Sequence, residues 1–433
     1  MTEITDPTRG SSEPGRLWTL TNMSEATPDV LSPLCWSVWG DHLEVAARQA
    51  WADFGILPRR EVRMPADVNE RIGACFFGRQ AMNVDQARVF MAAIPGTSAE
   101  EFEKQICGFV RPDAVPVPDS RRRLPFIAAK APLVLTTQTR AIRRLHGTQF
   151  AWWRSDVFGG KASDPPLVSL TRAADRFEHS ISVHIRTRFL LQGLQSQVMV
   201  LAEKSGQPEL GSRCFSGFGG VEETAIAQAL WDLSRGQGSL DGFLSRYGFH
   251  GPAEGNPISR SWREDRSLVE SLVEGLARRP DHDSPRHREQ AAGEARRQAE
   301  AELFGRLPSR ARPGARPVLR MAATHARNLE LGKAAFLMAI DGCRAAARRL
   351  GADLAERAAL EDPEDIFYLT IPELVAGPPS NAREVVAFRR ARRDEHQQLD
   401  VPVNFEGMPD PVRAGAVAGG STVTGMAGGQ GTV

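Results

Sequence analysis

The sequence carries almost no net charge, which limits the classes of partner it favours. Among its 433 residues, 54 are Lys or Arg and 53 are Asp or Glu, so the formal net charge is +1. No overall field therefore favours nucleic acid. Two stretches, 121–123 and 278–320, are locally basic. Such runs usually form solvated helix faces or loops, so nucleic-acid binding is the least favoured of the functions considered below.

Cysteine is scarce and scattered. The five cysteines, none of them in a Cys-x-x-Cys pair, are Cys35, Cys75, Cys107, Cys214 and Cys343. This spacing predicts reduced and mostly buried thiols, with neither a disulfide framework nor a metal site.

Long apolar runs are also missing. No stretch of 18 apolar residues could span a membrane. The polar N-terminus, MTEITDPTRGSSEPGR, lacks the apolar core of a signal peptide. The expected location is therefore the cytoplasm. Because no glycine-rich phosphate loop followed by Lys is present, we expect no cofactor and no tight ATP binding in this chain itself.

Composition divides the chain into three parts. Residues 1–16 are rich in Pro, Gly, Ser and charge. They are predicted to be a disordered tail, since they offer too little apolar surface to offset the entropy of ordering. Residues 17–406 show mostly helical patterns, and residues 407–433 are expected to be a flexible Gly-, Ala- and Val-rich tail. The predicted fold class is mainly α with a few short strands, arranged as a multi-helix domain.

Two long helices dominate the apolar pattern. The first is predicted over 177–200, where apolar residues recur at spacings of three and four: Phe177, Ile181, Ile185 and Phe189. The second is predicted over 324–359, after a Pro- and Arg-rich break at 307–317. The pattern does not decide whether the second helix is interrupted near Gly351.

Local signals predict caps and one strand. Ser98 is a predicted helix cap because Glu101 follows three residues later. Pro363 is expected to end the long second helix, with the neighbouring acids capping the next turn. The apolar run IFYLTIPEL, 366–374, predicts a short buried strand that leads into a further helical turn.

Four motifs occur in the order found in one family of phosphoryl-transfer enzymes. They are NMSEATPDVLSPLCWS (22–37), GFGGVEETAIAQALWDLSRG (217–236), YGFHGPAEGNPISRSWRED (247–265) and DPEDIFYLT (362–370). Over residues 17–433 the chain resembles the acceptor-binding central region of the phosphoenolpyruvate (PEP) synthase and rifampicin phosphotransferase family of PEP-utilizing enzymes. The family's ATP-grasp and phosphohistidine domains are not covered by this resemblance.

The resemblance also implies partner proteins. Residues 425–433, GMAGGQGTV, resemble the strand and turn that open the family's swivelling phosphohistidine domain, so 407–433 is expected to be a vestigial start of that domain. The phosphohistidine is then expected on a separate swivelling protein. ATP and Mg are expected to act through an ATP-grasp protein.

A site follows from the same resemblance. In the family a Gln, together with the Arg and Lys of an R-E-x-x-K motif, surrounds the phosphohistidine and the acceptor hydroxyl. The matching positions here are Asn22, Leu329 and Lys333, with Glu330 retained. Cations at such a site neutralise charge on a transferring phosphoryl group. Leu329 removes one cation, and Arg327 points about 200° away around the helix. Lys333 still supplies a point charge.

His250 lies in a Gly-flanked loop beside Glu254, and Arg263 follows in the same loop. One interpretation is a general acid/base with a carboxylate partner. The other is a loop histidine hydrogen-bonded to backbone. The candidate catalytic residues are thus His250, Lys333 and Glu330.

Further residues are candidates for substrate binding. His184 lies on an apolar helix face, so it is either a histidine of the core or a residue that lines the acceptor pocket. His325 shares one side of its helix with Lys333. Trp36 is one of several aromatic residues with two interpretations: part of the hydrophobic core, or the lining of an apolar cavity. The candidate substrate-binding residues are Asn22, Glu254, Arg263, His184, His325 and Trp36.

The resemblance implies the acceptor-binding component of a split PEP synthase-like phosphotransferase. Such a component presents the hydroxyl of an apolar small molecule to a phosphohistidine on a partner protein. Phosphorylation is either the end product or activates the hydroxyl for elimination. We expect the pocket between the 177–200 and 324–350 helices. The alternative is a non-catalytic module that binds a small molecule or lipid, which Leu329 favours and Lys333, Glu330 and His250 disfavour.

Overall fold

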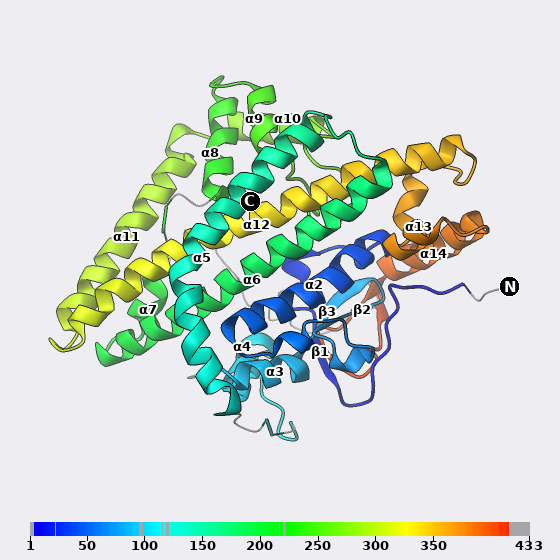
Figure 1. Cartoon of the computed structure of the whole chain (residues 1–433). Coiled ribbons are helices and arrows are strands. Elements are labelled where there is room, and N and C mark those ends of the chain that lie inside the picture. Colours follow the sequence, from blue (N-terminus) through cyan, green and yellow to red (C-terminus); the bar gives the residue numbers. More distant parts are fainter. Residues whose placement is uncertain are drawn as a thin grey trace.

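The computed structural model describes residues 4–21, 23–94, 98–114, 116–117, 121–215, 217–219 and 222–414. Within these ranges the fold is mainly α with a few short strands, as predicted (Figure 1). The α-helices are α1 (Met23–Ala26), α2 (Pro33–Phe54), α3 (Val84–Ala92), α4 (Ala99–Cys107), α5 (Leu124–Trp152), α6 (Pro166–Lys204), α7 (Glu209–Arg213), α8 (Glu222–Ser234), α9 (Leu240–Tyr247), α10 (Ser267–Ala277), α11 (Pro285–Arg306), α12 (Arg312–Glu356), α13 (Ile371–Ala376) and α14 (Ala382–Gln397).

The remaining elements are short. The strands are β1 (Leu17–Thr19), β2 (Gly73–Phe76), β3 (Arg79–Asn83), β4 (Leu399–Asp400), β5 (Asn404–Glu406) and β6 (Val412–Arg413). Single helical turns are η1 (Arg59–Glu61), η2 (Val68–Glu70), η3 (Arg121–Arg123), η4 (Trp153–Phe158, a π-helix), η5 (Asp281–Asp283) and η6 (Pro363–Tyr368). No described helix is both long enough and apolar enough to cross a membrane.

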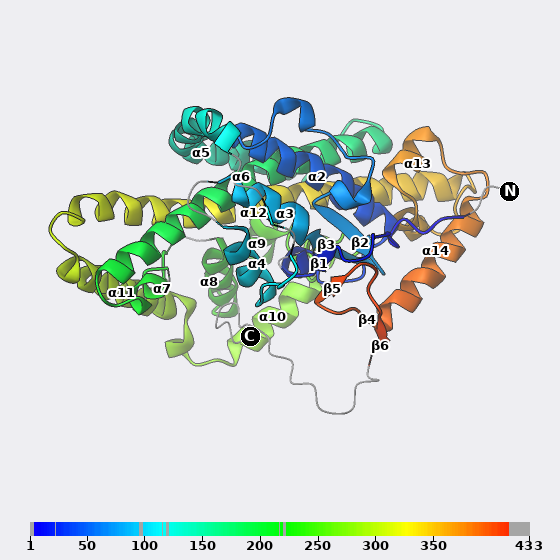
Figure 2. The same cartoon turned by 90° about the horizontal axis from the view of Figure 1, so that it is seen from below.

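Long helices form the centre of the molecule. The 45-residue α12 packs along the 39-residue α6, and α2 and α5 join this pair. Helices α7 and α11 lie at one end of the molecule, and α13 and α14 lie at the other (Figures 1 and 2). Helices α8, α9 and α10 form a separate group beside α12, and their position creates the pocket described below.

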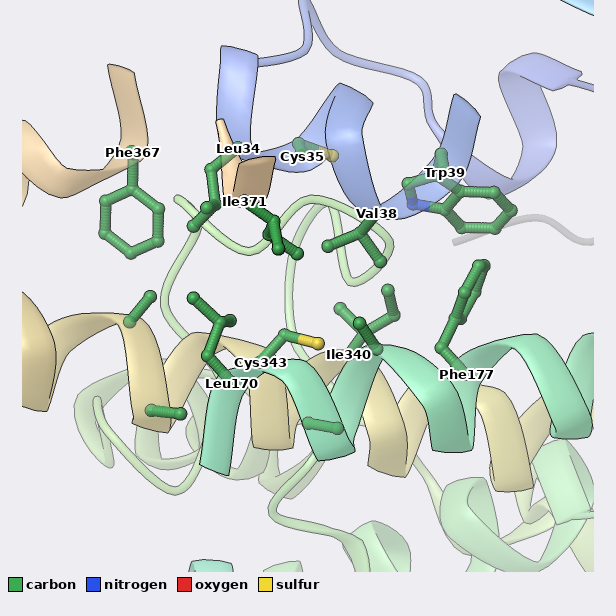
Figure 3. Packing of buried hydrophobic residues seen from close by; sticks show 14 of the residues in the cluster. Leu34, Cys35, Val38, Trp39, Leu170, Phe177, Ile340, Cys343, Phe367 and Ile371 are labelled. Carbon is green, nitrogen blue, oxygen red and sulfur yellow. The ribbon is translucent and has the colours of Figure 1, made fainter. Parts of the chain in front are cut away.

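Among the described residues, α6 and α12 meet in a filled hydrophobic core. Side chains from both helices meet residues of α2, η6 and α13 in one buried cluster, shown in Figure 3: Leu34, Cys35, Val38, Trp39, Leu170, Phe177, Ile340, Cys343, Phe367 and Ile371. Close packing of this kind leaves no room for a ligand. The prediction of an apolar pocket between these two helices is therefore wrong.

Helix α12 is longer than predicted at its start and uninterrupted near its end. It begins at Arg312, so the break expected at 307–317 covers only residues 307–311. Pro313 and Pro317 lie within the helix. The helix also continues through Gly351. A Cβ at Gly351 would collide with the carbonyl oxygen of Pro363. This glycine therefore permits close packing of α12 against η6.

The segment after α12 is helical where a strand was predicted. Asp362 accepts a hydrogen bond from the Glu364 backbone and forms a capping box with Asp365, which starts η6. Thr370 and Glu373 form a second capping box, which starts α13. Paired caps satisfy the free N–H groups of two helical turns. The run from 366 to 374 therefore forms two helical turns. The expected strand is wrong, whereas the burial of the run and the further helical turn, now seen as α13, are confirmed.

A four-stranded antiparallel sheet in the order β2-β3-β1-β5 joins the two ends of the described chain. Trp18 of β1 pairs with Phe405 of β5. Residues 4–16, predicted to be disordered, lie against this sheet. The Gly10 amide donates to the Cys75 carbonyl (2.6 Å), and the Gly78 amide donates to the Thr8 carbonyl (3.0 Å). The tail prediction is thus wrong for residues 4–16.

The predicted C-terminal tail is also structured where it is described. Strand β6 pairs with β4, and the Gly407 amide donates to the Arg16 carbonyl (2.8 Å). Residues 415–433 lie outside the described residues, as does the stretch 425–433 that resembles the start of a swivelling domain.

Candidate functional site

A pocket of about 240 Å³ opens between α8, the loop after α9 and α12. It brings together His250, Glu254, Glu330 and Lys333, four residues predicted from the sequence. These residues come from two separate parts of the chain, the loop after α9 and helix α12, so only the fold makes them neighbours. Its other lining residues are Glu222, Glu223, Ile226, Ala227, Leu230 and Ala334.

The loop 248–266 is fixed in place by backbone hydrogen bonds and by close packing. The Trp39 indole donates to the Gly255 carbonyl (2.8 Å), and the Trp262 amide donates to the His250 carbonyl (2.7 Å). Gly255 lies so close to the Ala26 carbonyl that a side chain would not fit there. The loop therefore holds His250 rigidly on the wall of the pocket.

A buried network of charged side chains holds the same loop to α12. Asp341 of α12 accepts hydrogen bonds from the Trp153 indole (2.8 Å), Arg263 (3.0 Å) and Arg344 (2.8 Å). Arg344 in turn donates to the Ser259 carbonyl (2.8 Å). Although burial alone would raise it, the pKa of Asp341 is lowered to about 2 by the two arginines and the hydrogen bonds from Arg263 and Trp153.

His250 and Glu254 form a hydrogen-bonded pair at the pocket. His250 Nδ1 lies 2.7 Å from Glu254 Oε2, and the histidine is only 8% exposed. Its Nε2 has no hydrogen-bond partner among the described residues. Burial favours a raised pKa for Glu254, but the hydrogen bond and charge of His250, with Lys333 and Arg344, lower it below its ordinary value. In the tautomer that carries its proton on Nδ1, His250 donates a hydrogen bond to ionised Glu254 and has its lone pair on Nε2.

Lys333 shares the same carboxylate. Its Nζ lies 3.7 Å from Glu254 Oε1 and 2.8 Å from Glu223 Oε1. Burial opposes the charged form, yet the hydrogen bond to Glu223 and the nearby carboxylates raise the pKa of Lys333. Lys333 and His250 therefore converge on Glu254, and Lys333 is held as a cation.

Two carboxylates of the pocket have raised pKa values. Burial, reinforced by Glu330 and Glu254, raises the pKa of Glu222 to about 7 although His250 and Arg246 oppose the rise. Burial and the neighbouring Glu223 and Glu254 likewise raise the pKa of Glu330. Carboxyl groups that are partly protonated near neutral pH are typical of functional sites.

Glu222 and Glu223 were missed from the sequence. They belong to the motif GFGGVEE, which was recognised only as a helix start, and acidic residues are common in the first turn of a helix. Their place in a pocket depends on how α8 packs near α12, and no local pattern encodes that packing.

The other predicted site residues lie elsewhere. Asn22 lies outside the described residues. Arg263 belongs to the buried network around Asp341, and Trp36 packs against the main hydrophobic core. Leu329 and Arg327 are absent from the lining of the pocket, as the helix geometry predicts for Arg327.

Both remaining histidines lie among helices away from the pocket lining. The His184 ring packs edge-on against Phe336, with ring centroids 5.3 Å apart, and burial, with Arg188 and Lys333 nearby, lowers its pKa to about 4. His325 is buried in α12, and burial lowers its pKa. Both arrangements fit the alternative of neutral core histidines.

The acidic pocket does not have the arrangement of a metal centre. Among the residues that the structure describes, no three His, Cys, Asp or Glu side chains are placed to hold one metal ion. The carboxylates of the pocket are instead distributed around its wall.

Comparison with known proteins identifies the class of this region. Residues 236–330 match the family model described as the fourth domain of rifampicin phosphotransferase. The match includes His250, Glu254 and Glu330, and it stops three residues before Lys333. The resemblance to the PEP-utilizing rifampicin phosphotransferase family is therefore confirmed in this segment.

Curated relatives extend the comparison. Uncharacterized proteins of Mycobacterium tuberculosis (strain H37Rv) and Mycobacterium bovis are each 34% identical to this chain over 114 residues. That stretch is 26% of this chain and 13% of each relative. The chain thus matches only about an eighth of the length of these relatives.

Proposed function

We propose that this chain is the acceptor-binding component of a PEP synthase-like phosphotransferase. The pocket binds a small molecule and presents its hydroxyl to a phosphohistidine on a partner protein, while a further ATP-grasp protein uses ATP and Mg to charge that histidine. The observation that carries the proposal is the convergence of His250 and Lys333 on Glu254, at 2.7 and 3.7 Å.

The pair His250–Glu254 has the arrangement of a general base. With the Nδ1 proton donated to Glu254, the unpartnered Nε2 accepts the proton of the acceptor hydroxyl. The acceptor oxygen attacks phosphorus, an O–P bond forms, and the N–P bond to the donor histidine breaks. The electron pair of that bond returns to the imidazole of the donor. Lys333 attracts the phosphoryl oxygens as a point charge.

The size and apolar wall of the pocket define the occupant further. A volume of about 240 Å³ is below the range of roughly 300–1,000 Å³ of drug-sized ligand sites, so the acceptor is small. Ile226, Leu230 and Ala334 would contact its carbon skeleton. The phosphorylated hydroxyl is then either the final product or the leaving group of an elimination.

The alternative is a non-catalytic module that binds a small molecule or lipid. It is favoured by Leu329, which stands where the family resemblance implies a second cation. It is disfavoured by the convergence of His250 and Lys333 on Glu254 at the pocket, an arrangement that ligand binding alone does not require.

Mass spectrometry of small-molecule acceptors distinguishes the two functions. Hydroxylated small molecules are incubated with ATP, Mg and the partner proteins, with and without this chain. We expect a phosphorylated or dehydrated product only when the chain is present, and we expect its loss in Lys333→Ala. Binding of a ligand without any product in the complete mixture would favour the non-catalytic module.

A further inference from the structure

The pocket has an excess of negative charge that its own residues do not neutralise. Four glutamates line it, against the single cation Lys333 and the imidazole of His250. Lys333 already pairs with Glu223 and Glu254, and His250 bonds the second oxygen of Glu254. Two glutamates are therefore left without a charged partner in the pocket.

Glu222 and Glu330 are these two residues. Glu222 Oε2 is buried without a hydrogen-bond partner among the described residues, and His146 Nε2 of α5 lies 3.9 Å from it, with burial lowering the pKa of that histidine. The Glu330 side chain makes no hydrogen bond or ion pair with another described residue, although the charge of nearby Lys333 opposes the rise of its pKa. Burying a carboxylate oxygen without a partner, as at Glu222, is costly, and a bound cation relieves this cost.

An organic ammonium group fits this arrangement better than a metal ion. A divalent cation needs several oxygens converging at about 2.0–2.6 Å, and the described side chains show no such cluster. An alkylammonium group donates separate hydrogen bonds to separate carboxylates and carries its own carbon skeleton. Ile226 and Leu230 of α8 line the same pocket and would contact that skeleton.

We infer that the pocket binds a small amino alcohol, with the ammonium group between Glu222 and Glu330 and the hydroxyl directed at His250 Nε2. The role of the hydroxyl depends on the proposed function, whereas ammonium binding does not. The ammonium would also add positive charge beside Lys333, which is shared between two glutamates and is the one Lys or Arg among the described residues that line the pocket.

Binding of the ammonium should depend on pH through Glu222. The charged and titratable groups that face Glu222 are His250 and Glu254 of the loop, Glu330 of α12, Arg246 of α9 and His146 of α5. The ammonium prefers ionised Glu222, whose pKa burial raises to about 7. Affinity for an amino alcohol should therefore fall as the pH is lowered from 8 to 6, because Glu222 then becomes protonated.

The test compares 6-amino-1-hexanol with 1,6-hexanediol, which has the same length and no charge. Dissociation constants of the whole chain are measured by calorimetry or ligand-observed NMR, without any phosphoryl donor. We expect the amino alcohol to bind about tenfold more tightly than the diol at pH 8. The double variant Glu222→Gln and Glu330→Gln should abolish this preference, and the exposed Glu274→Gln of α10 should retain it.

Equal affinity for the two compounds, no binding of the amino alcohol in the millimolar range, or a preference that survives in the double variant would overturn the inference. Circular dichroism of the variants verifies that they are folded. A preference for the amino alcohol without phosphorylation in the complete mixture would uphold this inference and refute the proposed function. Phosphorylation of uncharged alcohols, without any preference for the amino alcohol in binding, would uphold the proposed function and refute this inference.

Discussion

At the scale of single residues, the account depends on side chains whose environment sets their charge. Glu254 is ionised because it accepts a hydrogen bond from His250 and lies near Lys333, whereas Glu222 in the same pocket is held partly protonated by burial. Two carboxyl groups in one pocket thus have pKa values shifted in opposite directions, which is how one site supplies both an acceptor and a donor of protons.

The raised pKa of Glu222 predicts how stability changes with pH. Its carboxyl has a pKa of about 7 when folded, against about 4.3 in an unfolded chain, so the folded state binds this proton more tightly. This contribution to stability is present below about pH 4.3 and is lost as the pH rises towards 7. Glu222→Gln should match the wild type near pH 4 and be more stable at pH 8, by on the order of 3 kcal/mol. Urea denaturation at both pH values measures the difference, and equal stability at pH 8 would show that Glu222 is not strongly desolvated.

The candidate residues could be predicted from the sequence only where a motif marked them. His250, Glu254, Glu330 and Lys333 were all identified in this way, and the fold places them in one pocket. Glu222 was not identified, since its function depends on residues of α5, α9 and α12 that lie far from it in sequence.

At the scale of elements, the loop 248–266 is held to α12 by the buried charges around Asp341. Arg263 and Arg344 both hydrogen-bond this carboxylate, and Asp341 and Arg344 are almost completely buried. Asp341→Asn would leave the arginines without their charge partner and should cost about 3–5 kcal/mol of unfolding free energy. The matched control is Asp241→Asn, which removes an exposed ion pair with Arg266 and should cost less than about 1 kcal/mol. Similar denaturation midpoints for both variants would contradict the role of this network.

A substitution at Gly351 tests the close contact between α12 and η6. Gly351→Ala would force a methyl group against the Pro363 carbonyl and should destabilise the protein by about 1–3 kcal/mol. Gly275 of α10 has no heavy atom within 4 Å of its Cβ position, so Gly275→Ala should be neutral or stabilise by up to about 1 kcal/mol. Thermal denaturation of the two variants measures this contrast, which should vanish if η6 can move away from α12.

Helices were easier to predict than the ends of the chain, for a physical reason. The helices over 177–200 and 324–359 follow from local periodicity, as does the cap in which Ser98 accepts a hydrogen bond from the Glu101 amide. Residues 4–16 bond instead to partners far along the chain, such as Gly10 to Cys75 and Arg16 to Gly407, which no local pattern reveals. The strand predicted over 366–374 failed because two capping boxes favour helical turns despite the apolar run.

At the scale of the whole molecule, the proposed function requires that this chain does not itself handle the nucleotide. A nucleotide site of the usual kind combines a glycine-rich loop and a Lys at a helix N-terminus, and the sequence has no such motif. We therefore predict that the isolated chain neither hydrolyses ATP nor binds it at micromolar concentration. Calorimetric titration with MgATP tests this prediction, and a micromolar dissociation constant would contradict the split arrangement.

The central claim is that His250 activates an acceptor hydroxyl for phosphoryl transfer, and His250→Ala tests it most directly. The rate of acceptor phosphorylation is measured in the complete mixture for wild type, His250→Ala and His282→Ala, a control whose side chain is 80% exposed on η5. The account predicts a loss of about 100-fold or more in His250→Ala, the usual scale for a general base, and no change in His282→Ala. An unchanged rate in a folded His250→Ala protein would contradict the account and leave His250 a structural residue of the loop.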